Sequence, residues 1–362
     1  MKTHMERQAE GDPLPAPGRP RQSGAKLRLL LGLAVAATFL GLTFFRLEWH
    51  TVQTAIVAAR SGPLLLGLAS LTAGFSIRIL RWWWMLRVLE PGLPLRNCAR
   101  PFLISLAINN TVPLRAGDVL RTVGFRHELR SPPMRILGTL VIERLLDLFT
   151  LLAFFFAGLL SVAAGAFPPS LFRASLAMAA CCLLSLMTFI LWPDRLRQGL
   201  AWLSSRPWVS PRWSVRLDAW VEQLFETLSL LRLPKLALQL LGLSILTWAF
   251  EGGLFACVAW SLQASAHPMG PWFALSTGTL ATLIPGSPGH LGTFDYFAML
   301  GLIAYGAKRT MAAVFALLVH VCLWVPVTLV GGLLFATSRH VTGDSPSHSG
   351  VNSPNGRDLP KF

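Results

Sequence analysis

Long apolar segments alternate with short polar and mostly basic segments along the chain. A helix needs about 20 predominantly apolar residues to cross a hydrocarbon core of about 30 Å. Six segments of roughly that length carry few charges, and each is predicted to be a spanning helix. They are residues 27–45, 63–80, 136–160, 171–192, 236–260 and 311–336. The pattern predicts an all-α, polytopic integral membrane helical bundle with six to eight spanning helices, the higher numbers depending on segment 291–306.

Two further apolar segments are too short to cross a bilayer. Residues 102–112 would reach only about 16 Å as a helix, and both flanks are basic, so both ends belong on the cytoplasmic side. A re-entrant hairpin with its turn near residues 109–113 satisfies both observations. Residues 272–284 form a second such segment, broken at 285–289. Entry of the two hairpins from opposite sides predicts an inverted repeat, which is typical of transporters with a midplane binding site.

Composition and charge support this class of protein. Hydrophobic residues make up 53% of the chain and charged residues only 14%, against about 25% in soluble domains. The formal net charge of +15 would indicate nucleic-acid binding in a soluble protein, but the hydrophobicity excludes that interpretation here. The basic excess instead marks the cytoplasmic side. We therefore expect no nucleic-acid partner and a multi-pass protein of the cell (inner) membrane with a cytoplasmic N-terminus.

The polar segments define the domain boundaries. Residues 1–26 are proline-rich and lack the features of a cleaved signal peptide, so they are predicted to be a disordered cytoplasmic tail. Residues 27–336 form the transmembrane domain, in which residues 193–235 are expected to be amphipathic helices on the cytoplasmic membrane surface. Residues 337–362 are predicted to be a second disordered tail.

Aromatic and basic residues gather at the end of segment 63–80. Trp82, Trp83 and Trp84 lie between Arg78 and Arg87. This combination favours an interfacial aromatic belt over a stacking site for bases. The five cysteines lie in or beside apolar segments without paired spacing, so we interpret them as small core residues.

Polar residues that border the first short segment form the densest candidate site. Asn110, Arg115, Asp118 and Arg121 lie around the expected break, and a helix that opens at Gly117 would add exposed N–H groups. An anionic phosphate headgroup suits this set, in which Arg115 and Arg121 would hold the phosphate. The alternative is an ordinary cytoplasmic ion pair with topology-marking arginines.

A second set of charged residues lies within predicted spans, where charges are costly and normally face a polar interior. Helical spacing allows Arg144 to pair with Asp147 and places Glu143 on the same side. Asp295, His320 and Glu251 are further titratable residues in apolar segments. Each of these three residues either holds a proton or contacts a cationic group, or is a buried residue whose hydrogen bonds are satisfied within the protein.

Enzyme signatures do not match. Gly306 is separated from Lys308 by Ala307, so the Walker A pattern fails. The pair His127–Glu128 lacks the second histidine of a zinc protease helix, and no G-x-S-x-G elbow occurs. The polar segments between spans are too short for a catalytic domain of about 100 residues. We expect no catalytic residues, no metal and no cofactor.

Three motifs resemble signatures of one known family. They are NTVPLRAGDVLR from Asn110, ERLLD from Glu143 and PGSPGHLGTFD from Pro285, which includes Gly289. Together they are similar to the lysylphosphatidylglycerol synthase transmembrane region, or flippase-like family, over most of the chain. Asp118 and Asp295 stand where members of this family usually have glutamate, and His320 stands where they often have arginine.

The resemblance implies a membrane protein that moves an anionic phospholipid or polyprenyl-type lipid between leaflets. Lysyl transfer is not expected, because the chain has no soluble aminoacyltransferase-like domain. Two alternatives remain open: a membrane transferase that acts on a lipid acceptor, and a non-transporting subunit that binds lipid through its basic face. Membrane lipids with anionic headgroups are the expected partners, and a homo-oligomer is left open.

Overall fold

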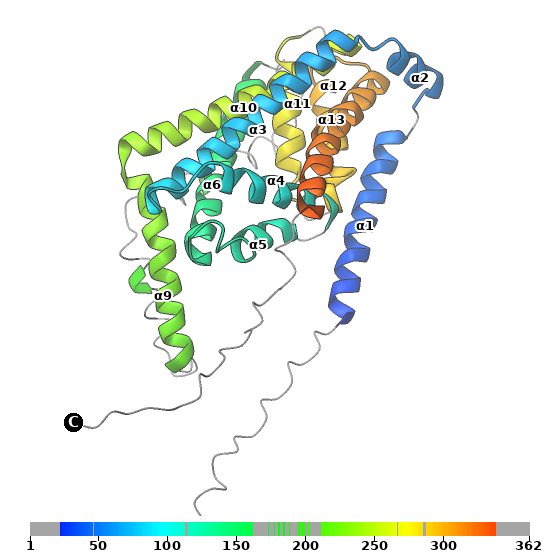
Figure 1. The fold of residues 1–362 in the computed structure, drawn as a ribbon. Helices are drawn as coiled ribbons and strands as arrows, with labels where there is room; N and C mark the ends of the chain where they lie inside the picture. Colours follow the sequence, from blue (N-terminus) through cyan, green and yellow to red (C-terminus); the bar gives the residue numbers. More distant parts are fainter. Residues whose placement is uncertain are drawn as a thin grey trace, which may run out of the picture.

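The computed structural model describes residues 22–45, 47–112, 115–161, 211–265, 267–284 and 287–337, with isolated positions between 173 and 202. Every regular element in these parts is a helix, which confirms the all-α prediction (Figure 1). The α-helices are α1 (Gln22–Phe44), α2 (Trp49–Val57), α3 (Ser61–Leu89), α4 (Arg96–Thr111), α5 (Ala116–Val123), α6 (Pro133–Ser161), α9 (Pro211–Leu228), α10 (Pro234–Leu262), α11 (Gly270–Ala281), α12 (Thr293–Ile303) and α13 (Arg309–Ala336). Two 3-10 helices, η2 (Ser229–Arg232) and η3 (Pro288–His290), complete them.

Three of the described helices are long and apolar enough to cross a membrane: α3, α10 and α13. Helix α6 has 29 residues but contains Glu143, Arg144 and Asp147. The total of six to eight spans stays a prediction, because most of the expected crossing at 171–192 lies outside the described residues. The link at 163–170 and the tails at 1–21 and 338–362 lie outside them as well.

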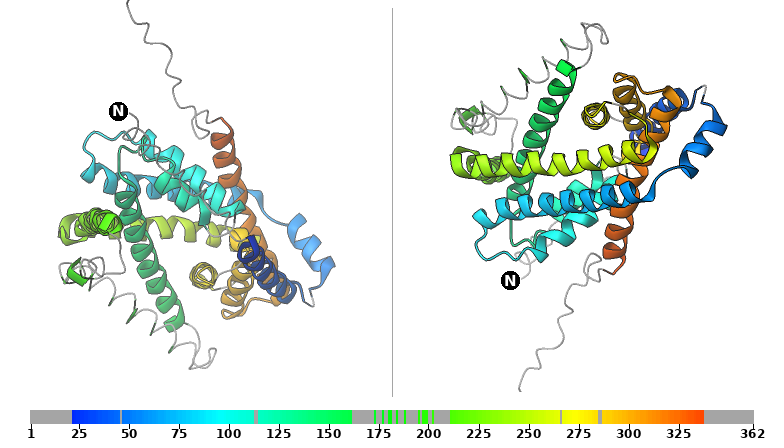
Figure 2. Two further views of the ribbon diagram at one scale, coloured as in Figure 1. Left: turned by 90° about the horizontal axis from the view of Figure 1, so that it is seen from below. Right: turned by 90° about the horizontal axis from the view of Figure 1, so that it is seen from above.

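Helices α3 and α10 lie side by side and antiparallel (Figure 2). Two glycines of α3 allow this close approach, since a methyl group on Gly67 would lie 3.1 Å from Cys257 Cβ and one on Gly74 would lie 3.4 Å from Phe250 Cβ. The Ser70 hydroxyl donates a hydrogen bond of 2.6 Å to the carbonyl oxygen of Phe250. Small residues at helix contacts are typical of membrane helices, because they increase van der Waals contact between backbones.

The first short apolar segment forms the predicted hairpin. Helices α4 and α5 pack against each other and run antiparallel, with Gly117 beside Ser105 and Asn97 near Glu128. Their 16 and 8 residues reach about 24 and 12 Å, so neither helix spans the hydrocarbon core alone. Pro113 and Leu114, inside the break, lie outside the described residues.

The second short segment also forms a hairpin, and it includes the segment whose crossing was undecided. Helices α11 and α12 run antiparallel: Gly278 faces Ala298, and the rings of His267 and Tyr305, beyond the other ends of the two helices, lie with their centroids 4.9 Å apart. Helix α12 has 11 residues, about 16 Å, which is too short for a separate crossing. Segment 291–306 is therefore the return arm of this hairpin. Pro285 and Gly286 lie outside the described residues.

Each hairpin contacts one long helix from its own half of the chain and one from the other half. Helix α4 packs on α13, and its counterpart α11 packs on α6, while the return arms α5 and α12 contact α6 and α13. Apolar side chains form two clusters, one centred on α3, α4 and α6 and the other on α10 to α13. The first arm of each hairpin therefore packs on a long helix of the other half of the chain, and the return arm packs on the long helix that follows it.

The prediction that the tryptophans and arginines of α3 lie at the membrane interface is wrong for Arg78, Arg81 and Trp82. Trp82 and Arg81 are fully buried, and Arg78 is mostly buried. The physical reason is the helical period: Gly74, Arg78, Arg81 and Met85 recur every three to four residues and face neighbouring helices. Arg87 alone keeps the expected exposed position.

Part of the polar segment 193–235 is helical as predicted. Helix α9 packs on α6 and places Glu226 Oε2 2.9 Å from Arg135 Nε. Its apolar residues Phe225 and Leu228 are buried, while its opposite face is exposed. This amphipathic helix is therefore attached to the bundle through one face.

Cysteine labelling tests the first hairpin. In a chain whose five native cysteines are replaced by serine, Arg100→Cys and Arg126→Cys are expected to react with an impermeant maleimide from the same side of the membrane. The two flanks are adjacent, since Arg100 Nη1 lies 4.0 Å from Glu128 Oε1. Val57→Cys, beyond the first predicted span, is the control and should react from the opposite side. Reaction of positions 100 and 126 from opposite sides would contradict the hairpin.

Candidate functional site

A polar cavity of about 220 Å³ lies where the two hairpins meet. Side chains from α3, α4, α5, α6, α10, α11, α12 and α13 line it. Seven of the residues that the sequence singled out contribute to this lining: Asn110, Arg115, Asp118, Arg144, Glu251, Gly289 and His320. Four others are not part of the lining: Arg121 and Glu143 pair with each other, Asp147 pairs with Arg81, and Asp295 pairs with His320. The tertiary structure thus separates one predicted set into a lining and a supporting layer.

Gly289 allows the two hairpin breaks to approach each other. Its φ is +65°, a conformation that is costly for residues with a Cβ. An added methyl group would lie 2.7 Å from Trp324 Nε1 and 3.2 Å from the carbonyl oxygen of Asn110. The same indole N–H donates a hydrogen bond of 3.3 Å to that carbonyl, and the amide of Asn110 donates one of 2.9 Å to Thr328 Oγ1. Helix α13 therefore binds the end of α4 beside the second break.

The break before α5 is held by a reciprocal pair of hydrogen bonds. Asn109 Nδ2 donates to Asp118 Oδ1 at 2.9 Å, and the backbone N–H of Asp118 donates to Asn109 Oδ1 at 3.2 Å. Asp118 also lies in the first turn of α5, where a carboxylate is favoured by the helix dipole. Its carboxylate therefore lies, bound to Asn109, in the first turn of the helix whose terminus we expected to bind a phosphate.

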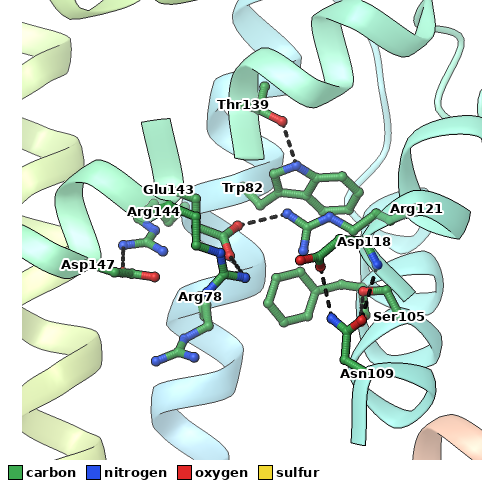
Figure 3. Close-up of polar contacts among 12 residues, drawn as sticks. Arg78, Trp82, Ser105, Asn109, Asp118, Arg121, Thr139, Glu143, Arg144 and Asp147 are labelled. Carbon is green, nitrogen blue, oxygen red and sulfur yellow. Dashed lines mark hydrogen bonds and ion pairs between the residues drawn. The ribbon is translucent and has the colours of Figure 1, made fainter. Parts of the chain in front are cut away.

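Arg121 lies in the supporting layer, paired with Glu143 instead of facing the cavity (Figure 3). The two side chains are 1% and 2% exposed, and Nη2 lies 2.7 Å from Oε2. The guanidinium carbon is 4.0 Å from the ring centroid of Trp82 and 4.8 Å from that of Phe102. An arginine held between a carboxylate and two aromatic rings joins α5 to α6 and α3.

The predicted pairing of Arg144 with Asp147 is wrong. Arg144 Nη2 instead lies 3.3 Å from Glu143 Oε1, and its side chain is 43% exposed toward the cavity. Asp147 Oδ1 accepts a hydrogen bond of 2.7 Å from Arg81 and one of 3.2 Å from Trp248 Nε1. The spacing along α6 allowed a local pair, but partners on α3 and α10 bind Oδ1 of the buried carboxylate instead, and Oδ2 has no hydrogen-bond partner among the described residues.

The second hairpin has a hydrogen-bonded pair between α12 and α13, as the first has the Arg121–Glu143 pair between α5 and α6. His320 Nδ1 lies 2.8 Å from Asp295 Oδ1, and Asp295 Oδ2 accepts a hydrogen bond of 2.8 Å from the backbone N–H of Gly292. Asp295 therefore caps α12, while His320 faces the cavity from α13. In both halves a polar pair joins the return arm of the hairpin to the next long helix.

Arg78 and Glu251 also line the cavity, and the sequence interpretation missed the first of them. Arg78 Nη2 lies 2.8 Å from Glu251 Oε2. Glu251 therefore contacts a cationic group, which is one of the two interpretations that the sequence left open. The signal for Arg78 was its position on the glycine-bearing face of α3, four residues after Gly74.

The charges of the lining favour an anionic ligand. Three arginines, Arg78, Arg115 and Arg144, face two carboxylates, Asp118 and Glu251. Arg115 makes no salt bridge with any described residue, and Arg144 shares Glu143 with Arg121. Among the described residues, no three His, Cys, Asp or Glu side chains come together as a metal site.

This geometry defines a multi-pass helical membrane protein in which two interrupted hairpins surround a polar cavity. Residues 29–331 match the family model described as the lysylphosphatidylglycerol synthase TM region. The chain therefore belongs to this family, as its three motifs indicate. A comparison with curated proteins found no match, and a comparison with solved structures found none either.

Proposed function

We propose that the protein binds the headgroup of an anionic phospholipid or polyprenyl-type lipid in the cavity and translocates it between leaflets. The observation that carries this proposal is the position of Arg115 and Arg144 in a cavity formed by both hairpin breaks. The acyl or prenyl chains stay in the surrounding lipid while the headgroup passes between the hairpins. Paired broken segments of this kind surround the substrate site in many transporters.

The arginines are suited to a phosphate because of their positions and free donors. Arg115 precedes α5 in a left-handed conformation, with φ of 52°, and this places it at the break. Arg144 enters from α6 and is the more exposed member of its pair with Glu143. Guanidinium groups form short, charge-assisted hydrogen bonds to phosphate, so two of them compensate for the loss of headgroup hydration. We assign phosphate binding to Arg115 and Arg144, and a supporting role to Arg121.

Reconstitution tests the proposal. Purified protein in proteoliposomes is expected to speed exchange of fluorescent phosphatidylglycerol between leaflets, measured by dithionite quenching from outside. Protein-free vesicles give the background. Binding of the lipid without faster exchange would favour a non-transporting lipid-binding subunit and contradict translocation.

Arg115→Gln is expected to slow this exchange about tenfold, because a charge-assisted hydrogen bond to phosphate is worth about 1.5–3 kcal/mol. Arg126→Gln is the matched control: it removes an exposed arginine beyond the same hairpin, outside the cavity. The control should retain the wild-type rate. Equal rates in both variants would show that Arg115 does not bind the transported group.

A further inference from the structure

Arg78 occupies a part of the cavity that has the composition of a cation site. Its Nη2 atom lies 2.8 Å from Glu251 Oε2, and both side chains are 11% exposed. Its guanidinium carbon lies 4.7 Å from the ring centroid of Trp248 and 5.9 Å from that of Phe75. A carboxylate beside aromatic faces is the set of groups that proteins use to bind ammonium ions. Here a side chain of the protein itself fills that position.

Arg78 also differs from the other two arginines of the lining. Arg115 has no salt-bridge partner among the described residues, and Arg144 keeps a large exposed surface. The charge of Arg78 is compensated by Glu251, so its main electrostatic effect on a ligand is to keep a second cation away from this carboxylate. The cavity therefore has an anion-binding part and a cation-binding part that is already occupied.

We infer that Arg78 is a specificity-determining residue that excludes lipids with an amine in the headgroup and selects phosphodiester headgroups without a positive charge. The inference rests on the proposed function, since it assumes that the phosphate reaches Arg115 and Arg144. An ammonium group attached to that phosphate enters the same small cavity, where it meets a guanidinium in place of a free carboxylate. Because Glu251 is already paired with Arg78, no free carboxylate compensates the charge of the ammonium group at this position.

Removal of the guanidinium converts the excluded position into a binding site. In Arg78→Gln, the Glu251 carboxylate and the Trp248 ring are free to accept an ammonium group. The preference between an anionic and a zwitterionic lipid is therefore expected to reverse. In the double variant Arg78→Gln with Glu251→Gln, neither charge remains, and the phosphate that both lipids share determines binding.

The experiment measures lipid preference by native mass spectrometry. The full chain in detergent is exposed to equimolar phosphatidylglycerol and phosphatidylethanolamine, and the ratio of the two bound lipids is recorded. Wild type should favour phosphatidylglycerol. Arg78→Gln should lower the ratio about tenfold or more and the double variant should bring it near unity, since 1.4 kcal/mol corresponds to a tenfold change. Arg78→Lys, which returns a cation to Glu251 and Trp248, should restore the preference for phosphatidylglycerol.

Arg87→Gln is the matched control. Arg87 lies on the same helix with its guanidinium carbon 4.8 Å from the ring centroid of Trp83, but it is exposed and outside the cavity. Its ratio should equal that of wild type. If Arg78→Gln fails to fold, the comparison of wild type with the double variant still tests the inference. Equal ratios of the two bound lipids in these proteins would overturn it.

The two proposals fail in different ways. If wild type binds neither lipid, the proposed function falls and the inference falls with it. If wild type binds phosphatidylglycerol but the Arg78 variants keep its preference, only the role of Arg78 is overturned. A reversal that also occurs in Arg87→Gln would likewise overturn it.

Discussion

Replacement of Arg121 by alanine is expected to lower the free energy of unfolding by about 3–5 kcal/mol, because it leaves Glu143 buried without its main partner. Arg121 and Glu143 are 1% and 2% exposed, and their closest atoms are 2.7 Å apart. The substitution also removes the cation from between Trp82 and Phe102. These contacts join α5 to α3, α4 and α6, so their loss should also weaken the first hairpin.

Denaturant titration in detergent, followed by tryptophan fluorescence, measures this effect. Arg197→Ala is the control, because its pair with Glu222 is 49% and 63% exposed and should contribute under about 1 kcal/mol. The double variant Arg121→Met with Glu143→Leu should recover much of the lost stability, since apolar residues often replace a buried ion pair well. A destabilisation by Arg121→Ala no larger than that of the control would contradict a structural role for the pair.

Gly117→Ala is expected to lower the free energy of unfolding by about 3 kcal/mol, at the upper end of the range for overpacked contacts. An added methyl group would overlap the carbonyl oxygen of Ser105 and lie 2.8 Å from Asn109 Oδ1. Both atoms belong to α4, so α5 must move away from it. This movement would break the hydrogen bonds between Asn109 and Asp118 and displace the wall of the cavity.

The same titration tests this expectation, and lipid exchange should slow together with the loss of stability. Gly242→Ala is the matched control, because nothing lies within 4 Å of its added methyl group and Gly242 is inside α10. Alanine is favoured over glycine in a helix by up to about 1 kcal/mol, so the control should be neutral or more stable. Equal behaviour of the two variants would contradict the close contact at Gly117.

Both hairpins could be predicted from the sequence because their signals are local. A short apolar run, a proline and basic flanks are enough to predict that residues 102–112 turn back instead of continuing as a spanning helix. For the second hairpin the sequence left segment 291–306 undecided. Its role became clear only from the contact of α12 with α11, in which Gly278 and Gly301 allow close packing.

Partners of the charged residues were much less predictable. Arg81 and Asp147 are 66 positions apart in the sequence, and Arg78 and Glu251 are 173 apart. A charge near the end of an apolar segment is common at membrane surfaces, and this favoured the interfacial interpretation of α3. The packing of α6 and α10 on α3 instead buries these charged residues, and no local sequence pattern indicates that burial.

The sequence by itself determined the class of protein, the two interrupted hairpins and the candidate polar residues around Asn110, Glu143 and Asp295. These follow from segment length, hydropathy and proline, which act through the chain's immediate neighbourhood. Only the tertiary structure decided which arginines face the cavity and which support it. A buried charge pairs with whichever opposite charge the packing of helices brings within about 4 Å, and that approach depends on residues far apart in the chain.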